Sequence, residues 1–398
     1  MSSPARDDTY RSVRPRVPVR PTLGRVRPPN APGTPVSAVI DLPSVSWFTN
    51  GRTALAHAAR LSSIRSGDAV LVPSYHCESM IEPFAWLGAE LVPYRIRDDL
   101  SIDLADIEGL CRPGIRAILV PQYFGHLRSL ESVSRMATDQ RWIVIEDCAH
   151  AFFNVGAAPM MGVHSDYVIA SLPKFFPVLD GGVLASRRHD ISTIKAHRVG
   201  LRDELRGVAD MIDYAAEYGR RSWAAGALNT AISLAKRWRN GRANPETRGK
   251  LPASRHGGVE FEPEHLDLSA CAVSRAWPYR VRRDRHASAR RSNWTALHEG
   301  LGDVRGIRFP IVALGAGDVP YVFAMEVENG EAVYPELKRL GVPAYRWETC
   351  HPGTGESRCG NTDRFHSDLI QLPCHQSLTP GELAWIIATV AGAVQALA

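Results

Sequence analysis

Short apolar runs alternate with helical patterns between Trp47 and about Ala185. Six of the runs have the length and composition of buried strands: Ala69 to Pro73, Glu90 to Tyr94, Ala117 to Pro121, Trp142 to Glu146, Tyr167 to Ala170 and Gly182 to Ala185. Strands that alternate with helices at this spacing are typical of a mostly parallel sheet, because parallel neighbours need a crossover connection. We therefore expect an α/β fold with helices on both faces of the sheet.

The second half of the chain has a different pattern. Ser269 to Gly300 repeats apolar residues at helical spacing, and strands are predicted at Val319 to Glu328 and at Val342 to Trp347. The chain finishes with an apolar run from Leu383 to Ala398, which is interrupted by polar residues and is shorter than the ~20 residues that cross a bilayer. We expect a packed C-terminal helix, no membrane span, and a smaller α+β domain.

The first 35 residues show almost no periodic pattern. They contain eight Pro and seven Arg against two Asp, a composition that buries too little surface to offset the entropy of ordering. We therefore predict a disordered basic tail over residues 1–38, which could wrap a partner subunit. The large domain is then expected over residues 39–255 and the small domain over residues 256–398.

Composition narrows the classes of function. A chain of 398 residues with 44% hydrophobic and 22% charged residues is typical of a soluble protein with more than one domain. The net charge of +5 equals that of the tail alone, so a nucleic-acid-binding face is not indicated. Seven scattered cysteines with no C-x-x-C pair predict free thiols in a reducing, cytoplasmic compartment and no metal site. The basic run 236–242 reads as a solvated loop or as a phosphate-binding patch.

One lysine stands out by its surroundings. The chain has five Lys against 42 Arg, and Lys174 alone lies among apolar residues, in Ala-Ser-Leu-Pro-Lys-Phe-Phe-Pro-Val-Leu-Asp-Gly-Gly (170–182). Removal from water lowers the pKa of a lysine and frees its lone pair for attack on a carbonyl carbon. The alternative is a surface lysine whose stem lies across apolar neighbours.

Two acids end the apolar run Val144-Ile145-Glu146-Asp147. Carboxylates at the C-terminal end of a parallel strand lie where such sheets bind ligands, and a buried carboxylate there needs a cationic partner. A protonated pyridine nitrogen would be such a partner. The alternative is that Asp147 caps the start of a helix.

Two further segments are candidates for binding. Asn50-Gly51-Arg52-Thr53 leads into a helix, and the start of a helix offers N–H groups to a phosphate, although Asn and Thr are also ordinary caps. Tyr75 and His76 follow a strand directly and could cover a flat ring, although core packing is the default for such residues.

The order and separation of these segments resemble the DegT/StrS-type sugar aminotransferases, which are pyridoxal-phosphate enzymes. The resemblance runs from about Asn50 to the C-terminus and includes Asp180-Gly181-Gly182, similar to the family's "DGG". It also includes the segment 372–379 (Leu-Pro-Cys-His-Gln-Ser-Leu-Thr), similar to "LPLHPxLT". The resemblance implies fold type I of the pyridoxal-phosphate transferases, with a mostly parallel, seven-stranded-type sheet in the large domain.

The resemblance also implies roles for single residues. Lys174 would form the Schiff base with the cofactor and act as the catalytic residue, and Asp147 would pair with the pyridinium nitrogen. The remaining positions would hold the cofactor's ring and phosphate: Gly51, Arg52, Thr53, Tyr75, His76, His150 and Ser171. The Ser-to-Lys spacing is shorter than in the family, and the family's ring-stacking aromatic falls on Cys77.

The resemblance implies transfer of an amino group, from glutamate, to a keto sugar that carries a nucleotide, in the biosynthesis of a polysaccharide or natural product. A homodimer is expected. A related branch of the family, which acts as dehydratases, has His in place of the lysine, so Lys174 argues against it. The alternative function is a protein that binds the cofactor without turnover and regulates or assembles others. A dinucleotide-dependent oxidoreductase is disfavoured because no G-x-G-x-x-G opens the first helix.

Overall fold

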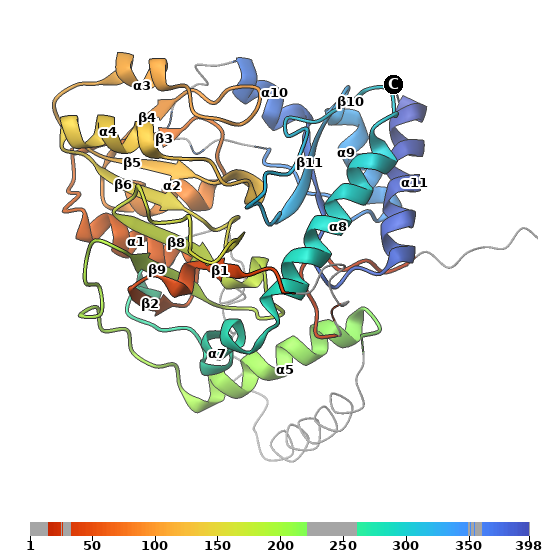
Figure 1. Ribbon diagram of the computed structural model, residues 1–398, viewed down its shortest axis with the longest axis horizontal. Coiled ribbons are helices and arrows are strands. Elements are labelled where there is room, and N and C mark those ends of the chain that lie inside the picture. The colour runs from red at the N-terminus through yellow and green to blue at the C-terminus, as the bar shows by residue number, and fades with distance from the viewer. Residues whose placement is uncertain are drawn as a thin grey trace, which may run out of the picture.

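The computed structural model describes residues 15–24, 26, 33–220, 261–348, 351, 354 and 360–397. The basic run 236–242 lies outside these residues. Within them the chain forms a large part around one sheet and a smaller part around another, with α8 and α11 side by side in the smaller part (Figure 1).

The central sheet has seven strands in the order β2-β9-β8-β6-β5-β3-β4. The strands are β2 (Ser44–Phe48), β3 (Ala69–Pro73), β4 (Glu90–Tyr94), β5 (Ile115–Pro121), β6 (Ile143–Asp147), β8 (Tyr167–Ser171) and β9 (Gly182–Ser186). The strands from β8 to β4 are parallel, and β9 is antiparallel to both of its neighbours. The prediction of a mostly parallel α/β sheet is confirmed, with β2 as an additional edge strand.

The sheet is buried on both faces, which explains why its strands are nearly continuous apolar runs. In β3, Val70 and Val72 pack into one apolar cluster with the helices α1 and α2, while Ala69 and Leu71 pack into another on the opposite face. Successive side chains of a strand point to opposite faces, so a strand between two helical layers needs apolar residues at every position. The helices that connect the parallel strands are α1 (Gly51–Leu61), α2 (Glu78–Trp86), α3 (Leu104–Leu110) and α4 (Glu131–Gln140).

The smaller part is built on a three-stranded antiparallel sheet in the order β10-β11-β12. Its elements are α8 (Arg283–Leu301), β10 (Ile307–Arg308), β11 (Val322–Val327), α9 (Gly330–Leu340), α10 (Gly360–Asp368), β12 (Leu369–Pro373) and α11 (Pro380–Leu397). The strand predicted at residues 319–328 is confirmed as β11. The strand predicted at residues 342–347 is wrong, because only Tyr345 pairs with β12, through Gln371. Pro343 has no N–H to donate to a neighbouring strand. The Arg346 side chain donates a hydrogen bond to the Ser367 carbonyl.

The long helix expected at residues 269–300 is interrupted. It forms α7 (Ala272–Arg280) and α8, separated at Val281, whose backbone is extended at φ −84° and ψ 152°. Pro278 lies in the last turn of α7 and removes one of the hydrogen bonds that would carry the helix onward. α7 also packs beside α5 (Leu201–Glu217) of the large part.

The boundary expected after residue 255 lies too early in the chain. The Leu268 carbonyl accepts the Thr49 N–H, and the Leu266 carbonyl is bonded to the ring of His57, so this segment belongs with the large part. The side chain of Asp180 accepts the Cys271 N–H at 2.7 Å. The smaller part therefore begins at α8.

The prediction of a disordered tail over residues 1–38 is wrong for two described stretches. Residues 15–24 pack on the body, where Val17 and Thr22 are buried. Residues Val36–Ala38 form β1, which pairs with β7 (Phe153–Val155). Val17 joins the main apolar cluster, so apolar contact is available to this Pro-rich segment after all.

Among the described helices, α11 alone is long and apolar enough to cross a membrane. Its side chains Leu383, Ile386, Val390 and Val394 are buried, and it contacts α8 and α9. This packing agrees with the C-terminal helix expected from the sequence. The five cysteines that the structure describes are free thiols, as the sequence predicted.

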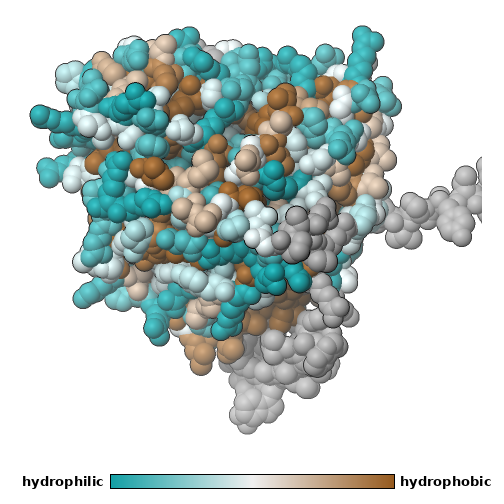
Figure 2. Space-filling view, viewed as in Figure 1, coloured by the Kyte–Doolittle hydropathy of each residue, from teal (hydrophilic) through white to brown (hydrophobic). Residues whose placement is uncertain are grey.

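Polar and apolar residues are interspersed over much of the face in Figure 2, with apolar residues at the lower edge, over the start of α5. Leu201 and Leu205 of α5 are 75% and 62% exposed. Single apolar residues are common on protein surfaces, but two large ones on one helix turn provide area for contact with another chain.

The first testable prediction concerns Gly182 of β9. A Cβ atom at this position would lie 1.9 Å from the Asn50 carbonyl oxygen, which belongs to the backbone. We expect Gly182→Ala to lower the free energy of unfolding by about 1–3 kcal/mol or more, because the strand and the start of α1 must separate. Chemical denaturation measures this change.

Gly392→Ala is the matched control. Gly392 lies in α11 with no atom within 4 Å of the added Cβ, so the same substitution should stabilise the protein by about 0.5–1 kcal/mol. Equal effects of the two substitutions would contradict the close approach of β9 and α1.

Candidate active site

A cavity of about 580 Å³ lies where the C-terminal ends of the parallel strands meet the smaller part. Pro121 ends β5, Asp147 ends β6 and Ser171 ends β8, and all three line this cavity. Ligands of parallel α/β sheets bind at this edge, because the loops that leave the strands converge there. Six of the expected site residues line the cavity: Gly51, Arg52, Asp147, His150, Ser171 and Lys174.

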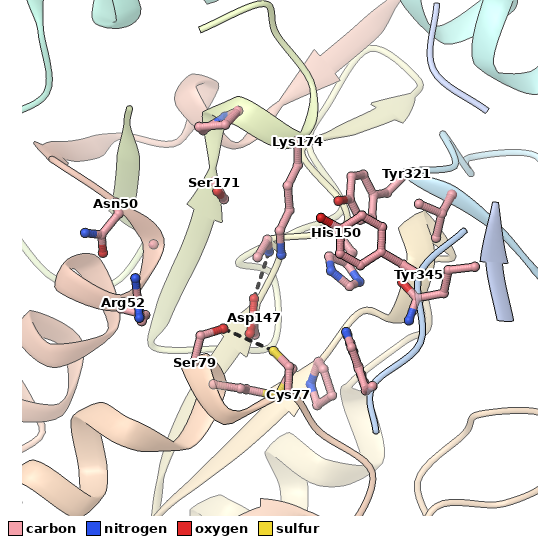
Figure 3. Close-up of a pocket in the computed structure, with 18 of the residues that line it drawn as sticks. Asn50, Arg52, Cys77, Ser79, Asp147, His150, Ser171, Lys174, Tyr321 and Tyr345 are labelled. Carbon is pink, nitrogen blue, oxygen red and sulfur yellow. Dashed lines mark hydrogen bonds between the residues drawn. The ribbon is translucent and has the colours of Figure 1, made fainter. Parts of the chain in front are cut away.

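Lys174 ends a short helical turn, Leu172–Lys174, directly after β8. Its side chain extends into the cavity toward Asp147, with Tyr321 and His150 beside it (Figure 3). The Nζ atom lies 5.5 Å from the centre of the Tyr321 ring, a cation–π distance. Burial lowers the pKa of this amine, and its electrostatic interactions with the side chains of Cys77 and Asp147 partly oppose the shift. The structure therefore does not support the alternative of a surface lysine.

Asp147 is 5% exposed at the end of β6. Burial raises the pKa of its carboxyl group, while the charge of Lys174 and the N–H of Ala149, 2.8 Å from Oδ1, oppose that rise. No helix begins at this residue in the structure, so the alternative of a helix cap is wrong.

The neighbouring Glu146 points to the other side of β6, as alternation along a strand requires. Its oxygens accept hydrogen bonds from Gln122, Gly162 and Ser165 at 2.8, 2.9 and 2.8 Å. These bonds hold Glu146 within the fold, and one of its partners, Gln122, lines the cavity. Of the two adjacent acids, Asp147 alone lines the cavity.

His150 lies within an aromatic group on the cavity wall. Its ring stacks on Phe124 at 5.6 Å between centres and lies 4.6 Å from the ring of Tyr321. Burial, and secondarily the charge of Lys174, hold the pKa of His150 well below its usual value. The imidazole is therefore neutral at physiological pH and can donate or accept one hydrogen bond at each nitrogen.

The start of α1 combines a cap with a binding position. The Asn50 side chain accepts the Thr53 N–H at 2.9 Å and the Thr53 hydroxyl at 3.2 Å, so Thr53 serves the cap and does not line the cavity. Gly51 lies against Ser171, because a Cβ atom added at Gly51 would lie 3.6 Å from the Cβ atom of the serine. The Arg52 guanidinium, which could have bound a phosphate or projected outward, forms an ion pair with Glu82 of α2 at 3.2 Å.

Tyr75 and His76 do not line the cavity, which corrects the expectation that either covers a bound ring. Tyr75 is fully buried, 4.8 Å from the ring of Trp347. His76 is held by the Pro73 carbonyl and by the His351 N–H, and burial lowers its pKa to about 4. Cys77 lies on the cavity wall in their place, with its thiol 3.1 Å from the Ser79 hydroxyl.

The Asp-Gly-Gly segment has a structural task. The carboxylate of Asp180 accepts the Cys271 N–H and the Ser274 hydroxyl, so it holds the start of α7. Gly181 has φ +122°, in the region that favours glycine, and an added Cβ would lie 2.4 Å from the Leu172 side chain. Gly181 therefore lets the segment after Lys174 pack on Leu172, and Gly182 lets it pack on the backbone of Asn50 at the start of α1.

Arg290 of α8 was not expected from the sequence. It is fully buried, and its guanidinium donates to the carbonyls of Lys174, Pro320 and Tyr321 at 2.9, 3.0 and 3.2 Å. It also donates to the Gln376 side chain at 2.8 Å. Burial lowers its pKa to about 10, so it stays charged at neutral pH. An arginine in a helix with several others carries no signal of this role in the sequence.

Tyr321 and Arg20 line the cavity as well, and sequence reasoning identified neither of them. Tyr321 is reached by a loop before β11, and Arg20 belongs to the segment expected to be disordered. No local pattern marks either residue, because each reaches the site only through the tertiary fold.

Solved structures share this fold. The chain matches an aminotransferase, TlmJ, from Streptoalloteichus hindustanus at 18% identity and a TM-score of 0.60, over 89% of this chain and 86% of the other. It matches NtdA from Bacillus subtilis, described with bound cofactor PMP, at 14% identity and a TM-score of 0.58, over 88% and 73% of the two chains. The fold is therefore that of the pyridoxal-phosphate-dependent transferases of fold type I.

Residues 41–194, which contain Asp147 and Lys174, match the model of the DegT/DnrJ/EryC1/StrS aminotransferase family. This match confirms the resemblance found in the sequence. A GDP-perosamine synthase of Escherichia coli O157:H7 is 28% identical over 121 residues, 30% of this chain and 33% of that protein. The alignments to the first three curated relatives span 28–39% of their lengths.

The second prediction concerns the reactivity of Lys174 in protein freed of any cofactor. Competitive acetylation of Lys174, read by mass spectrometry over a pH range, should give a titration midpoint below that of the side-chain amine of Nα-acetyl-lysine, because burial lowers the pKa of Lys174. Asp147→Asn should shift the midpoint lower still, since Asp147 raises this pKa. An unchanged or higher midpoint in the Asn variant would contradict the electrostatic contact between the two side chains.

The third prediction concerns Arg290. Arg290→Met leaves three buried carbonyls without a donor, so we expect a loss of about 2–4 kcal/mol in the free energy of unfolding. Arg305→Met, at an exposed position, should change stability by less than about 0.5 kcal/mol. Denaturant titration measures both, and a near-neutral Arg290→Met would show that the buried guanidinium is dispensable.

Proposed function

We propose that this protein is a pyridoxal-phosphate-dependent aminotransferase in which Lys174 carries the chemistry. The observation that supports this most directly is that a desolvated amine, Lys174, and a buried carboxylate, Asp147, line the same cavity and interact electrostatically. When bound, the cofactor supplies an aldehyde that accepts an amino group and a ring that withdraws electrons. The match of residues 41–194 to the aminotransferase family model favours the same conclusion.

The residues present fit that group. The buried carboxylate of Asp147 can face a protonated ring nitrogen, and in its ionised form it would keep that nitrogen protonated. The N–H groups at the start of α1, with the Ser171 hydroxyl beside Gly51, suit a phosphate. The cavity of about 580 Å³ lies within the range of about 300–1,000 Å³ usual for small-molecule sites, so room remains for a substrate.

Lys174 has two tasks in this proposal. Its neutral amine would hold the cofactor when that group is bound, and once released the same amine would take up and return the proton of the substrate's α-carbon. The lowered pKa increases the unprotonated fraction of the amine, which is the form that a general base requires. Arg290 holds the Lys174 carbonyl, so the amine starts from a fixed backbone position.

The remaining side chains of the cavity would orient the bound cofactor and exclude water. Neutral His150 lies beside Lys174 and can bond a ring substituent without adding a second cation. Cys77 occupies the position at which the family has an aromatic residue that stacks on the cofactor ring. One face of that ring would therefore contact the Cys77 thiol. The aromatic rings of Tyr321 and Trp347 close the same wall and exclude water.

We infer that the acceptor is a keto sugar, carried on a nucleotide, and that the donor is glutamate. The named activity of one relative, GDP-perosamine synthase, supports a sugar acceptor, and the reaction would serve polysaccharide or natural-product biosynthesis in the cytoplasm. We infer a homodimer as well, for which the exposed Leu201 and Leu205 of α5 offer apolar surface.

The fourth prediction tests the site and the turnover together. Protein supplied with pyridoxal phosphate should take up a visible absorption band, and borohydride reduction should leave the cofactor's mass on the peptide that contains Lys174. Adding L-glutamate or L-glutamine should convert the visible band to a near-ultraviolet one, at the faster rate with the true donor. Lys174→Ala should lack both the adduct and the conversion.

Lys195→Ala is the control, because Lys195 is exposed and lies outside the cavity. Cofactor mass on any other peptide would refute the assignment of Lys174. A band that forms but stays unchanged with every amino donor would favour the alternative function, cofactor binding without turnover.

A further inference from the structure

The segment of residues 15–24, here called the N-terminal strap, is fastened to both parts of the molecule. The ring of His375 bonds to the Pro18 carbonyl at 2.9 Å, and Thr22 exchanges two hydrogen bonds of 3.1 Å with the Ser377 hydroxyl. Val17 is buried in the main apolar cluster. These contacts fix the strap on either side of Arg20.

Arg20 is itself held at two points by α5. Its backbone N–H donates to the Tyr214 hydroxyl at 3.1 Å, and its guanidinium carbon lies 5.1 Å from the centre of the Tyr214 ring. A guanidinium stacked on an aromatic ring keeps its N–H donors in the ring plane and available at its edges. The side chain is therefore oriented before any ligand arrives.

This guanidinium belongs to the cavity of Lys174. Val19 and Arg20 of the strap line the same cavity as Lys174 and Tyr321. Burial raises the pKa of the Tyr321 hydroxyl, and Arg20 is one of two cations whose charge opposes that rise. The ring of Tyr321 also lies 5.5 Å from the Lys174 amine. Arg20 and Lys174 thus act on the same tyrosine.

The charge of Arg20 is not matched by a carboxylate in the described part of the chain. Two other arginines line the cavity: Arg52 pairs with Glu82 at 3.2 Å, and Arg346 donates to the Ser367 carbonyl. None of the ion pairs found among the described residues includes Arg20. A half-buried cation without a counter-ion in a ligand cavity is available to an anion that enters from solvent.

We propose that Arg20 binds an oxyanion of the substrate, a carboxylate of the amino donor or a phosphate of the acceptor, so that the N-terminal strap forms part of the substrate site. The inference rests on the proposed function for the identity of the substrate. Arginine binds both groups through two parallel N–H donors, which fixes the orientation of the anion as well as its position. Arg20 is in this role a binding residue, distinct from Lys174 and from the positions expected to hold the cofactor.

The fifth prediction uses unreactive probes on the full-length protein, so that it does not depend on turnover. Calorimetry at fixed ionic strength measures binding of glutarate, a dicarboxylate, of UDP, a diphosphate, and of glutaramide, the uncharged diamide of glutarate. We expect Arg20→Met to weaken binding of one of the two anions roughly 10- to 100-fold, the effect of losing a charged hydrogen-bonded pair. Arg20→Lys should weaken it less, because the charge remains and the fork is lost.

Arg16→Met is the matched control, because Arg16 lies in the same strap and its side chain is exposed. A loss confined to glutarate identifies the donor's carboxylate, and a loss confined to UDP identifies the acceptor's phosphate. Unchanged binding of both anions in Arg20→Met, or an equal loss in Arg16→Met, would overturn the proposal.

The cofactor band separates this inference from the proposed function. Arg20→Met protein that cannot form the visible band of the wild type would place Arg20 in the cofactor's own site and overturn the proposal. Wild-type protein that forms no band, yet binds glutarate or UDP through Arg20, would refute the proposed function and leave the anion site standing.

Discussion

The charged groups of the cavity depend on one another, because each is expensive to bury alone. The Lys174 amine tolerates its surroundings because the Asp147 carboxylate lies at the end of the neighbouring strand, and the pKa of each group shifts in response to the other. β6 and β8 are parallel and adjacent, so the sheet itself brings the two charges together. The rest of the site is arranged around these two side chains, with the backbone donors of α1 and the aromatic rings of His150, Tyr321 and Trp347 lining the same cavity.

A second buried charge joins the two parts of the molecule. Arg290 reaches from α8 to the carbonyl of Lys174 and to the loop that presents Tyr321, and Gln376 bridges from the end of β12 to the Phe175 carbonyl. A guanidinium with several N–H donors suits this junction, because three backbone segments meet there without regular secondary structure to satisfy their oxygens. The lysine loop is therefore fixed from both parts at once, so a shift of the smaller part would be transmitted to the reactive amine.

The sequence predicted the central sheet well because burial on both faces leaves a direct record: β3 is apolar and buried over its whole length. The sequence did not predict β2, because serines alternate with the apolar residues of this strand and interrupt its apolar pattern. The false strand at residues 342–347 has the right composition, but a single pairing at Tyr345 does not make a ladder. Lys174 and Asp147 could be identified from the sequence because each is a charged residue within or at the end of an apolar run. The sequence did not show that Tyr75 and His76 point away from the cavity. Tertiary contacts decide which side chain of a turn faces a cavity, and a local pattern does not record them.

The N-terminal strap changes how the ends of this chain should be regarded. A segment rich in proline and arginine is commonly trimmed before crystallisation or replaced by a purification tag, on the assumption that it lies outside the folded body. Here such trimming to the first regular strand would remove Val19 and Arg20 from the cavity wall and uncover the surface on which Val17 rests. A shortened protein could fold, stay soluble and still have lost one side of its pocket, and a low activity measured on it would describe the truncation rather than the enzyme.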